Sequence, residues 1–251
     1  MTDIIYGRHP VLAALRQKES PLEEVIVAQG VGGHWLDEVR RLTRAAGIRL
    51  RLQERAALDR LCGTAHHQGI MARRGAYVYR SERDLLDRLP ELAEPALLVA
   101  ADSLTDPMNL GNLGRSAFSA GAHGLIIPKD RAVGVTPAVA KAAAGALEYL
   151  PVYRVTNLAD CLDRLKDAGL FIVGTDAEAA QSIYAADLTG PLVLVIGGEE
   201  KGLRPRVRKQ CDLVLAIPQA APEIGSLNAA TAGAVVLFEV RRQRLNQLER
   251  K

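Results

Sequence analysis

The sequence has few of the features that define several common classes of protein. It contains three cysteines, Cys62, Cys161 and Cys211, which are widely spaced and form no Cys-x-x-Cys pair. A disulfide framework or a zinc site is therefore not expected, and a reducing cytoplasm is the expected location. Aromatic residues make up only 4% of the chain, which argues against recognition of nucleobases by several stacked aromatic side chains.

Long apolar segments are also missing. No apolar run approaches the roughly 20 residues of a membrane-spanning helix, and the N-terminus lacks the basic and apolar stretches of a signal peptide. No cluster of aspartate and histidine indicates a metal site, so no metal is expected. The 251 residues are enough for one or two domains, and the composition, 48% hydrophobic and 24% charged, is that of a folded globular chain.

The charge is unevenly distributed. Residues 1–80 carry 13 Lys/Arg and 8 Asp/Glu, a balance of +5, whereas residues 81–251 carry 19 and 21, a balance of −2. Such an asymmetry favours contact between the N-terminal part and a polyanion such as a nucleic acid. A solvated basic surface is the alternative that charge alone leaves open.

The hydrophobic pattern predicts two α/β domains. Residues 1–75 read as a small unit whose helix over 34–46 ends at Gly47, and residues 76–95 read as a charged linker containing a short helix. Residues 96–251 alternate helices with apolar runs typical of parallel strands buried on both faces. The predicted strands are 97–101, 124–127, 171–174, 192–196 and 213–217. An open, mostly parallel sheet binds its ligand beyond the carboxyl ends of its strands.

Three segments follow these strands. Residues 106–113 are predicted to form a polar loop whose amides suit an anion, with Arg115 in the first turns of the next helix. Residues 196–203 are rich in glycine but fit neither the Rossmann nor the P-loop pattern. Residues 217–228 run from Ile-Pro to Ser-Leu-Asn, where helix capping by the serine or asparagine is the simple structural alternative.

Taken together, these segments resemble the three signature motifs of the SpoU (TrmH-like) branch of the SPOUT RNA methyltransferases. The first motif is present as Asn109, Gly111 and Arg115, the second as Gly197, Glu199 and Gly202, and the third as Ile217, Pro218, Ser226, Leu227 and Asn228. Residues 7–11 and 67–70 are similar to the substrate-binding domain of the bacterial rRNA enzymes. The resemblance covers nearly the whole chain.

The resemblance implies transfer of a methyl group from S-adenosylmethionine to a ribose 2′-hydroxyl in RNA. It also implies a C-terminal SPOUT domain with a deep trefoil knot, whose loops would be about 196–203 and 217–228, although knots are otherwise nearly absent from proteins. Members of the family form homodimers through this domain, and each site can borrow residues from the partner.

The resemblance also implies roles for individual residues. The implied cofactor-binding residues are Ile196, Gly197, Gly198, Gly202, Ile217, Pro218, Ser226 and Leu227. The implied catalytic residues are Arg115, Asn109, Glu199, Ser226 and Asn228, with Arg115 acting either as the base or as a group that polarises the hydroxyl. The expected RNA-binding residues are Arg8, His9, His67, Arg204 and Arg206.

Three hypotheses about the substrate remain open from the sequence. The first is a guanosine in 23S rRNA near the peptidyl-transferase centre, and the second is a tRNA or another rRNA site. The third is a catalytically silent RNA-binding assembly factor, which the presence of Arg115, Asn109 and Asn228 disfavours. Gln219, Gly225 and Ala230 depart from the family pattern and leave target choice and the detail of the cofactor loop open.

Overall fold

The computed structural model describes residues 3–17, 22–199, 201–221 and 225–249. The chain divides into two compact units. The first comprises Met1–Val78 and Val135–Tyr149, and the second comprises Tyr79–Gly134 and Leu150–Lys251. No helix among the described residues is long and apolar enough to cross a membrane.

The first unit is built on a four-stranded sheet in the order β1-β4-β2-β3. Its strands are β1 (Asp3–Tyr6), β2 (Leu22–Ala28), β3 (Arg49–Gln53) and β4 (Ile70–Arg74). Only β2 and β3 pair in parallel. Successive strand residues face opposite sides of a sheet. Val25 and Val27 accordingly pack with helices α1 (Arg8–Arg16) and α2 (His34–Ala46), whereas Ile26 packs with helix α3 (Arg55–Cys62).

Helix α2 confirms a prediction from the sequence. It spans the predicted residues, and Gly47 follows it with a φ of 67° while its amide bonds back to the last turn. Only a residue tolerant of the left-handed conformation ends a helix in this way at little cost.

A segment from the second half of the chain also belongs to the first unit. It contains α6 (Pro137–Ala142) and the 3₁₀ turn η2 (Ala146–Glu148). Ala140 joins the core of the unit, and Glu148 forms a 2.7 Å ion pair with the nearly buried Arg74 of β4. These contacts join residues 135–149 to the N-terminal sheet.

The second unit is built on a seven-stranded sheet in the order β7-β6-β5-β10-β8-β11-β9. The strands are β5 (Leu97–Asp102), β6 (Gly124–Pro128), β7 (Val152–Val155), β8 (Phe171–Thr175), β9 (Gln181–Ser182), β10 (Leu192–Gly197) and β11 (Leu213–Ala216). All neighbouring strands pair in parallel, which confirms the predicted parallel α/β class. The short strands β7 and β9 are absent from the sequence prediction.

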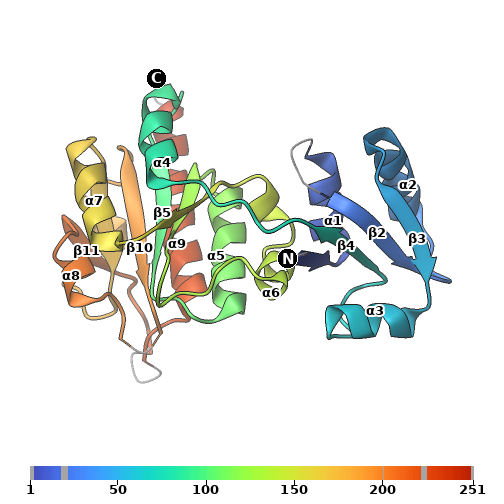
Figure 1. Cartoon of the computed structure of the whole chain (residues 1–251). Coiled ribbons are helices and arrows are strands. Elements are labelled where there is room, and N and C mark those ends of the chain that lie inside the picture. The colour runs from blue at the N-terminus through green and yellow to red at the C-terminus, as the bar shows by residue number, and fades with distance from the viewer. Residues whose placement is uncertain (1–2, 18–21, 200, 222–224, 250–251) are drawn as a thin grey trace. The chain divides into compact units, whose positions relative to one another are not determined.

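Helices cover both faces of this sheet. The helices of the unit are α4 (Glu82–Arg88), α5 (Pro107–Ser119), α7 (Leu158–Asp167), α8 (Pro205–Arg208) and α9 (Ala229–Leu248), with 3₁₀ turns η1 (Leu89–Glu91) and η3 (Ile183–Ala185). Val193 and Val195 of β10 pack in one core with α4 and α7. On the other side, α9 packs against both α5 and β10 (Figure 1).

Candidate active site at the carboxyl ends of β8, β10 and β11

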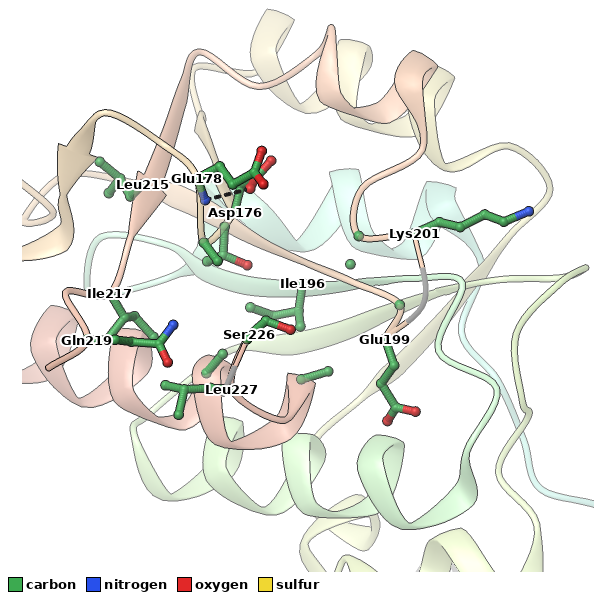
Figure 2. Close-up of a pocket in the computed structure, with 18 residues that line it drawn as sticks. Asp176, Glu178, Ile196, Glu199, Lys201, Leu215, Ile217, Gln219, Ser226 and Leu227 are labelled. Atoms are coloured by element: carbon green, nitrogen blue, oxygen red, sulfur yellow. Dashed lines mark hydrogen bonds between the residues drawn. The ribbon is translucent and has the colours of Figure 1, made fainter. Parts of the chain in front are cut away.

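A cavity of about 640 Å³ lies where β8, β10 and β11 end. Its walls come from residues 175–178, 196–199, 201–202, 215, 217, 219, 225–227, 229 and 232. These segments meet because parallel strands place their carboxyl ends at one edge. The expected cofactor residues that line it are Ile196, Gly197, Gly198, Gly202, Ile217, Ser226 and Leu227. Pro218 is exposed and is not a lining residue. Figure 2 shows Ser226 and Ile196 near the centre, with Glu199 and Lys201 to one side.

Two glycines give the cavity its backbone wall. A Cβ on Gly197 would lie 2.3 Å from the carbonyl carbon of Gly202, and one on Gly198 would lie 2.7 Å from the carbonyl oxygen of Ser103. Real Cβ atoms do not approach so closely, so any side chain would push these backbones apart. The chain after β10 can therefore fold back on itself and contact the end of β5 only with glycine at both positions.

Asn109 and Asn228 join the first motif to the third. Asn109 is buried in α5, and its Oδ1 accepts a 2.8 Å hydrogen bond from Nδ2 of Asn228. The Oδ1 of Asn228 accepts from the amides of Ala230 and Thr231 and so caps α9. The capping role and the link to Asn109 therefore occur together in one side chain.

Helix α5 begins earlier than the sequence analysis predicts. The polar loop predicted over residues 106–113 is wrong, because the helix starts at Pro107 and the Asp106 carboxylate accepts from the amides of Met108 and Asn109. The Asp106 side chain thus satisfies two of the free amides at the N-terminus of α5. The signal was present in the sequence, since aspartate before proline is a favoured helix start.

Arg115 lies on the third turn of α5 and is exposed. It does not line the cavity of its own chain. Met108 is seven residues earlier on the same helix and is 53% exposed, so the two side chains share one face. Within one chain, Glu199 and Ser226 line the cavity and Asn109 is hydrogen-bonded to Asn228, whereas Arg115 does not line the cavity.

Two carboxylates after β8 were missed by the sequence analysis. Asp176 and Glu178 line the cavity, and the Asp176 carboxylate accepts a 2.9 Å hydrogen bond from the Glu178 amide (Figure 2). This bond, together with the nearby Arg208, holds the pKa of Asp176 below its usual value. Their position directly after a predicted strand is the signal that could have identified them.

Arg204 and Arg206, expected to contact RNA, are both paired with carboxylates. The Asp102 side chain is fully buried at the end of β5, and it accepts from the Arg204 amide at 2.7 Å and from its Nε at 2.5 Å. Arg206 is more exposed and pairs with Asp160 at 2.6 Å. Arg204 therefore fastens the chain after β10 to β5.

The N-terminal residues expected to bind RNA differ in exposure. Arg8 and His9 are exposed at the start of α1, but His67 is fully buried. Its Nδ1 accepts from the Gly69 amide, so Nε2 donates to Asp59 at 2.8 Å. The prediction that the His67 side chain contacts RNA is wrong, because both ring nitrogens are already bonded and no surface remains.

The cavity fits S-adenosylmethionine. Apolar walls from Ile196, Ile217 and Leu227 suit the adenine ring and the methionine chain, and the glycine backbones allow close approach. The carboxylates of Asp176, Glu178 and Glu199 complement the positive charge of the sulfonium and the amino group. Among the described residues, no group of three or more His, Cys, Asp or Glu side chains could hold a metal ion.

Comparisons with known proteins agree with this site. A structure titled as the SpoU methyltransferase AviRb from Streptomyces viridochromogenes in complex with the cofactor AdoMet superposes with a TM-score of 0.79 and 27% identity. It covers 98% of this chain and 91% of that one. The fold and the cavity are those of an S-adenosylmethionine-dependent methyltransferase of the SPOUT class.

The family follows from the sequence comparisons. Residues 96–238 match the SpoU rRNA Methylase family, and residues 4–79 match the RNA 2′-O ribose methyltransferase substrate binding domain. The chain belongs to the SpoU rRNA methylase family and is an RNA 2′-O-methyltransferase.

Two relatives share almost the full length of this chain. The 23S rRNA (guanosine-2′-O-)-methyltransferase RlmB of Shewanella oneidensis is 41% identical over 96% of this chain and 98% of its own length. The putative TrmH family tRNA/rRNA methyltransferase YacO of Bacillus subtilis is 39% identical over 96% of each chain.

Proposed function

We propose that the enzyme methylates the ribose 2′-oxygen of a guanosine in 23S rRNA. The supporting observation is the 41% identity with a 23S rRNA guanosine methyltransferase across both units, including the N-terminal one. An enzyme that modifies ribosomal RNA would work in the cytoplasm, where ribosomes assemble.

The residues at the cavity have distinct roles in this proposal. S-adenosylmethionine supplies the methyl group. Ile196, Ile217 and Leu227 bind it through apolar contact, and Ser226 and Glu199 orient the reacting groups at the centre of the cavity. The Asn109–Asn228 hydrogen bond fixes α5 against the start of α9. Holding the reactants in position supplies much of the acceleration in transfers of this kind.

Arg115 acts on the ribose 2′-hydroxyl that receives the methyl group. A guanidinium is always charged near neutral pH, so it polarises the hydroxyl and stabilises negative charge on the oxygen. The proton passes to water as the oxygen–methyl bond forms, the sulfur–methyl bond breaks and S-adenosylhomocysteine leaves. Because Arg115 is exposed and outside its own cavity, it reaches the cavity of a second copy of the chain. Sites shared between two copies require a homodimer.

Exposed apolar side chains on α5 and α9 support this homodimer. Met108 on α5 and Phe238 on α9 are 53% and 51% exposed, and Leu245 lies seven residues beyond Phe238 and is 42% exposed. Exposed apolar side chains on two helices that pack together are typical of a protein interface. Burying these side chains in the dimer would also bring in Arg115, which shares the α5 face with Met108.

The trefoil knot is part of the same proposal. The chain leaves β10 after Gly197, returns in β11, and later enters α9, which packs back on β10. The close approach of Gly197 to Gly202 and of Gly198 to Ser103 is consistent with threaded loops around the cofactor.

The test is transfer of radiolabelled methyl from S-adenosylmethionine to total RNA, followed by mapping of the modified ribose. We expect one labelled guanosine in 23S rRNA and loss of transfer for Arg115→Ala with cofactor affinity unchanged. Mixing Arg115→Ala with Gly197→Val, each inactive alone, should restore part of the activity if the arginine acts across the dimer. An Arg115→Ala rate within a few-fold of wild type would contradict the assignment.

The second candidate substrate is a tRNA or a different rRNA nucleotide. The Bacillus subtilis relative, named as a tRNA/rRNA methyltransferase, is almost as similar as the rRNA enzyme. Both substrates use the same catalytic residues, so only the mapped nucleotide separates them. Label in the tRNA fraction would favour this candidate.

A further inference from the structure

Three segments of the first unit meet at one place on its surface. The turn before α1 contacts the turn before β4, because the Gly7 amide donates to the Ile70 carbonyl and the Arg8 amide donates to Oε1 of Gln68. Lys141 of α6 adds the third segment, since its Nζ lies 2.5 Å from where a Cβ on Gly7 would be. Because Gly7 has no side chain, the amine of Lys141 can occupy this space.

The segment that carries Lys141 is held firmly in this position. Gly145 packs so closely on α1 that a Cβ there would lie 2.6 Å from Cβ of Ala13 and 3.0 Å from the His9 carbonyl oxygen. The Arg74–Glu148 ion pair, with side chains 3% and 8% exposed, fastens the same segment to β4. Lys141 is thus a fixed member of the N-terminal unit, although it lies far along the chain.

The charge of the two cations in this cluster is not balanced by a carboxylate among the described residues. Among the described residues, neither Arg8 nor Lys141 forms an ion pair, and the sequence of residues 7–16, 64–69 and 135–149 contains one carboxylate, Glu148. That carboxylate is already bound to Arg74. Burial without a compensating carboxylate lowers the pKa of Lys141.

The guanidinium of Arg8 is held in place by stacking on an aromatic ring. Its guanidinium carbon lies 4.7 Å from the centre of the Trp35 ring, and the indole is itself fixed by a 3.0 Å hydrogen bond to the Gly32 carbonyl. A stacked guanidinium keeps its edge donors available for a phosphate and its outer face available for a base. Stacking also reduces the rotamer freedom that binding would otherwise cost.

The backbone around the cluster adopts conformations that are uncommon for residues with side chains. Gln68 has a φ of 56° and Ala144 a φ of 51°. Such strain is concentrated at functional sites. In Gln68 this strain accompanies the hydrogen bond that the side-chain oxygen accepts from the Arg8 amide.

We propose that Lys141, together with Arg8 and the neighbouring His9, forms a phosphate-binding site for the RNA substrate. Lys141 lies within the part of the chain that matches the methylase domain, yet the structure makes it part of the RNA anchor. The inference depends on the proposed function, because it takes RNA as the substrate. Elsewhere in this unit, Arg49, Arg51 and Arg73 share the carboxylate of Glu24 and are partly neutralised.

The test measures binding of the full-length protein to transcribed 23S rRNA over a range of salt concentrations. Lys141→Met keeps the apolar stem that packs on Gly7 and removes the charge. Each lost phosphate contact lowers the slope of log affinity against log salt by about 0.7–0.9. We expect that change together with a several-fold loss of RNA affinity, and unchanged affinity for S-adenosylmethionine.

Two further variants complete the design. Arg8→Met changes an exposed side chain, so it tests the same site even if Lys141→Met does not fold, and it should lower the slope similarly. Arg41→Met removes an exposed arginine of α2, 4.0 Å from Glu38, and should leave both quantities close to wild type.

The outcomes separate this inference from the proposed function. If the wild type methylates 23S rRNA while Lys141→Met and Arg8→Met bind it with unchanged affinity and slope, the phosphate site is wrong and the function stands. If the wild type neither binds nor methylates RNA, the proposed function fails and this inference fails with it.

Discussion

At the residue scale, one buried carboxylate links two parts of the methyltransferase unit. Asp102 accepts two hydrogen bonds from Arg204, whose side chain is 31% exposed. Removing one partner of a wholly buried pair costs about 3–5 kcal/mol. Because Arg204 can reach water, we expect Asp102→Ala to lower the free energy of unfolding by about 2 kcal/mol and to weaken cofactor binding through the chain after β10.

Denaturant unfolding checks this prediction. The control is Asp160→Ala, which removes the pair with the 69% exposed Arg206. Exposed pairs contribute about 0–1 kcal/mol. Equal losses for the two variants would show that Asp102 does not fasten this part of the chain.

The glycines of the cavity wall lead to a second prediction. Gly198→Ala would place a Cβ 2.7 Å from the Ser103 carbonyl oxygen, which forces the cavity backbone to move. We expect at least a tenfold loss of S-adenosylmethionine affinity, about 1.4 kcal/mol, measured by titration calorimetry. Gly190→Ala is the matched control, since a Cβ there meets no atom within 4 Å, and it should bind as wild type does.

At the scale of elements, helix α4 depends on a capping box at its N-terminus. The Asp84 carboxylate accepts from the amide and hydroxyl of Ser81, while Ser81 Oγ accepts from the Asp84 amide. The bonds from Ser81 lower the pKa of Asp84 below its ordinary value of 3.8. An aspartate with a lowered pKa stabilises the fold in its ionised form.

The capping box therefore predicts a pH dependence. Its contribution is present above about pH 4 and is lost as the pH falls through the lowered pKa of Asp84. Asp84→Asn should be less stable than wild type at pH 7, and the difference should shrink by pH 3 in urea unfolding. The control is Asp87→Asn, because Asp87 pairs with Arg83 on the exposed side of the same helix.

At the scale of the whole molecule, the N-terminal unit is built from two separate segments of the chain, Met1–Val78 and Val135–Tyr149. Deleting residues 1–75 would leave the buried side chain of Ala140 without its packing partners in the N-terminal core and the carboxylate of Glu148 without Arg74. We expect that deletion to aggregate. Deleting residues 1–78 and replacing 136–148 by a Gly/Ser linker of equal length should give a folded unit that binds S-adenosylmethionine but has weak affinity for RNA.

Size-exclusion chromatography and cofactor titration compare the two truncations. If both are equally folded, the segment 135–149 does not depend on the N-terminal sheet. If the linker version binds RNA as tightly as the full chain, the N-terminal unit is not the RNA anchor.

The sequence by itself determined the features that depend on nearby residues. Apolar runs rich in Leu, Ile and Val marked β5, β8 and β10, and Gly47 marked the end of α2. The three motifs identified the family and the cofactor through their resemblance to the SpoU motifs, because the residue types, their order and their separation all match. The early start of α5 at Asp106-Pro107 was also readable from the sequence, although it was predicted incorrectly.

Only the tertiary structure decided which distant residues meet. Asn109 and Asn228 are 119 positions apart, and Asp102 and Arg204 are 102 apart, so no local pattern reveals either pair. His67 and Arg204 were both expected to contact RNA, and only the structure shows that His67 is buried against Asp59 and that Arg204 pairs with the buried Asp102. Lys141 belongs to the N-terminal unit because Gly7 and Gly145 lack side chains there. Periodicity reports which face of an element is buried, whereas the partner it packs against is fixed only when the whole chain folds.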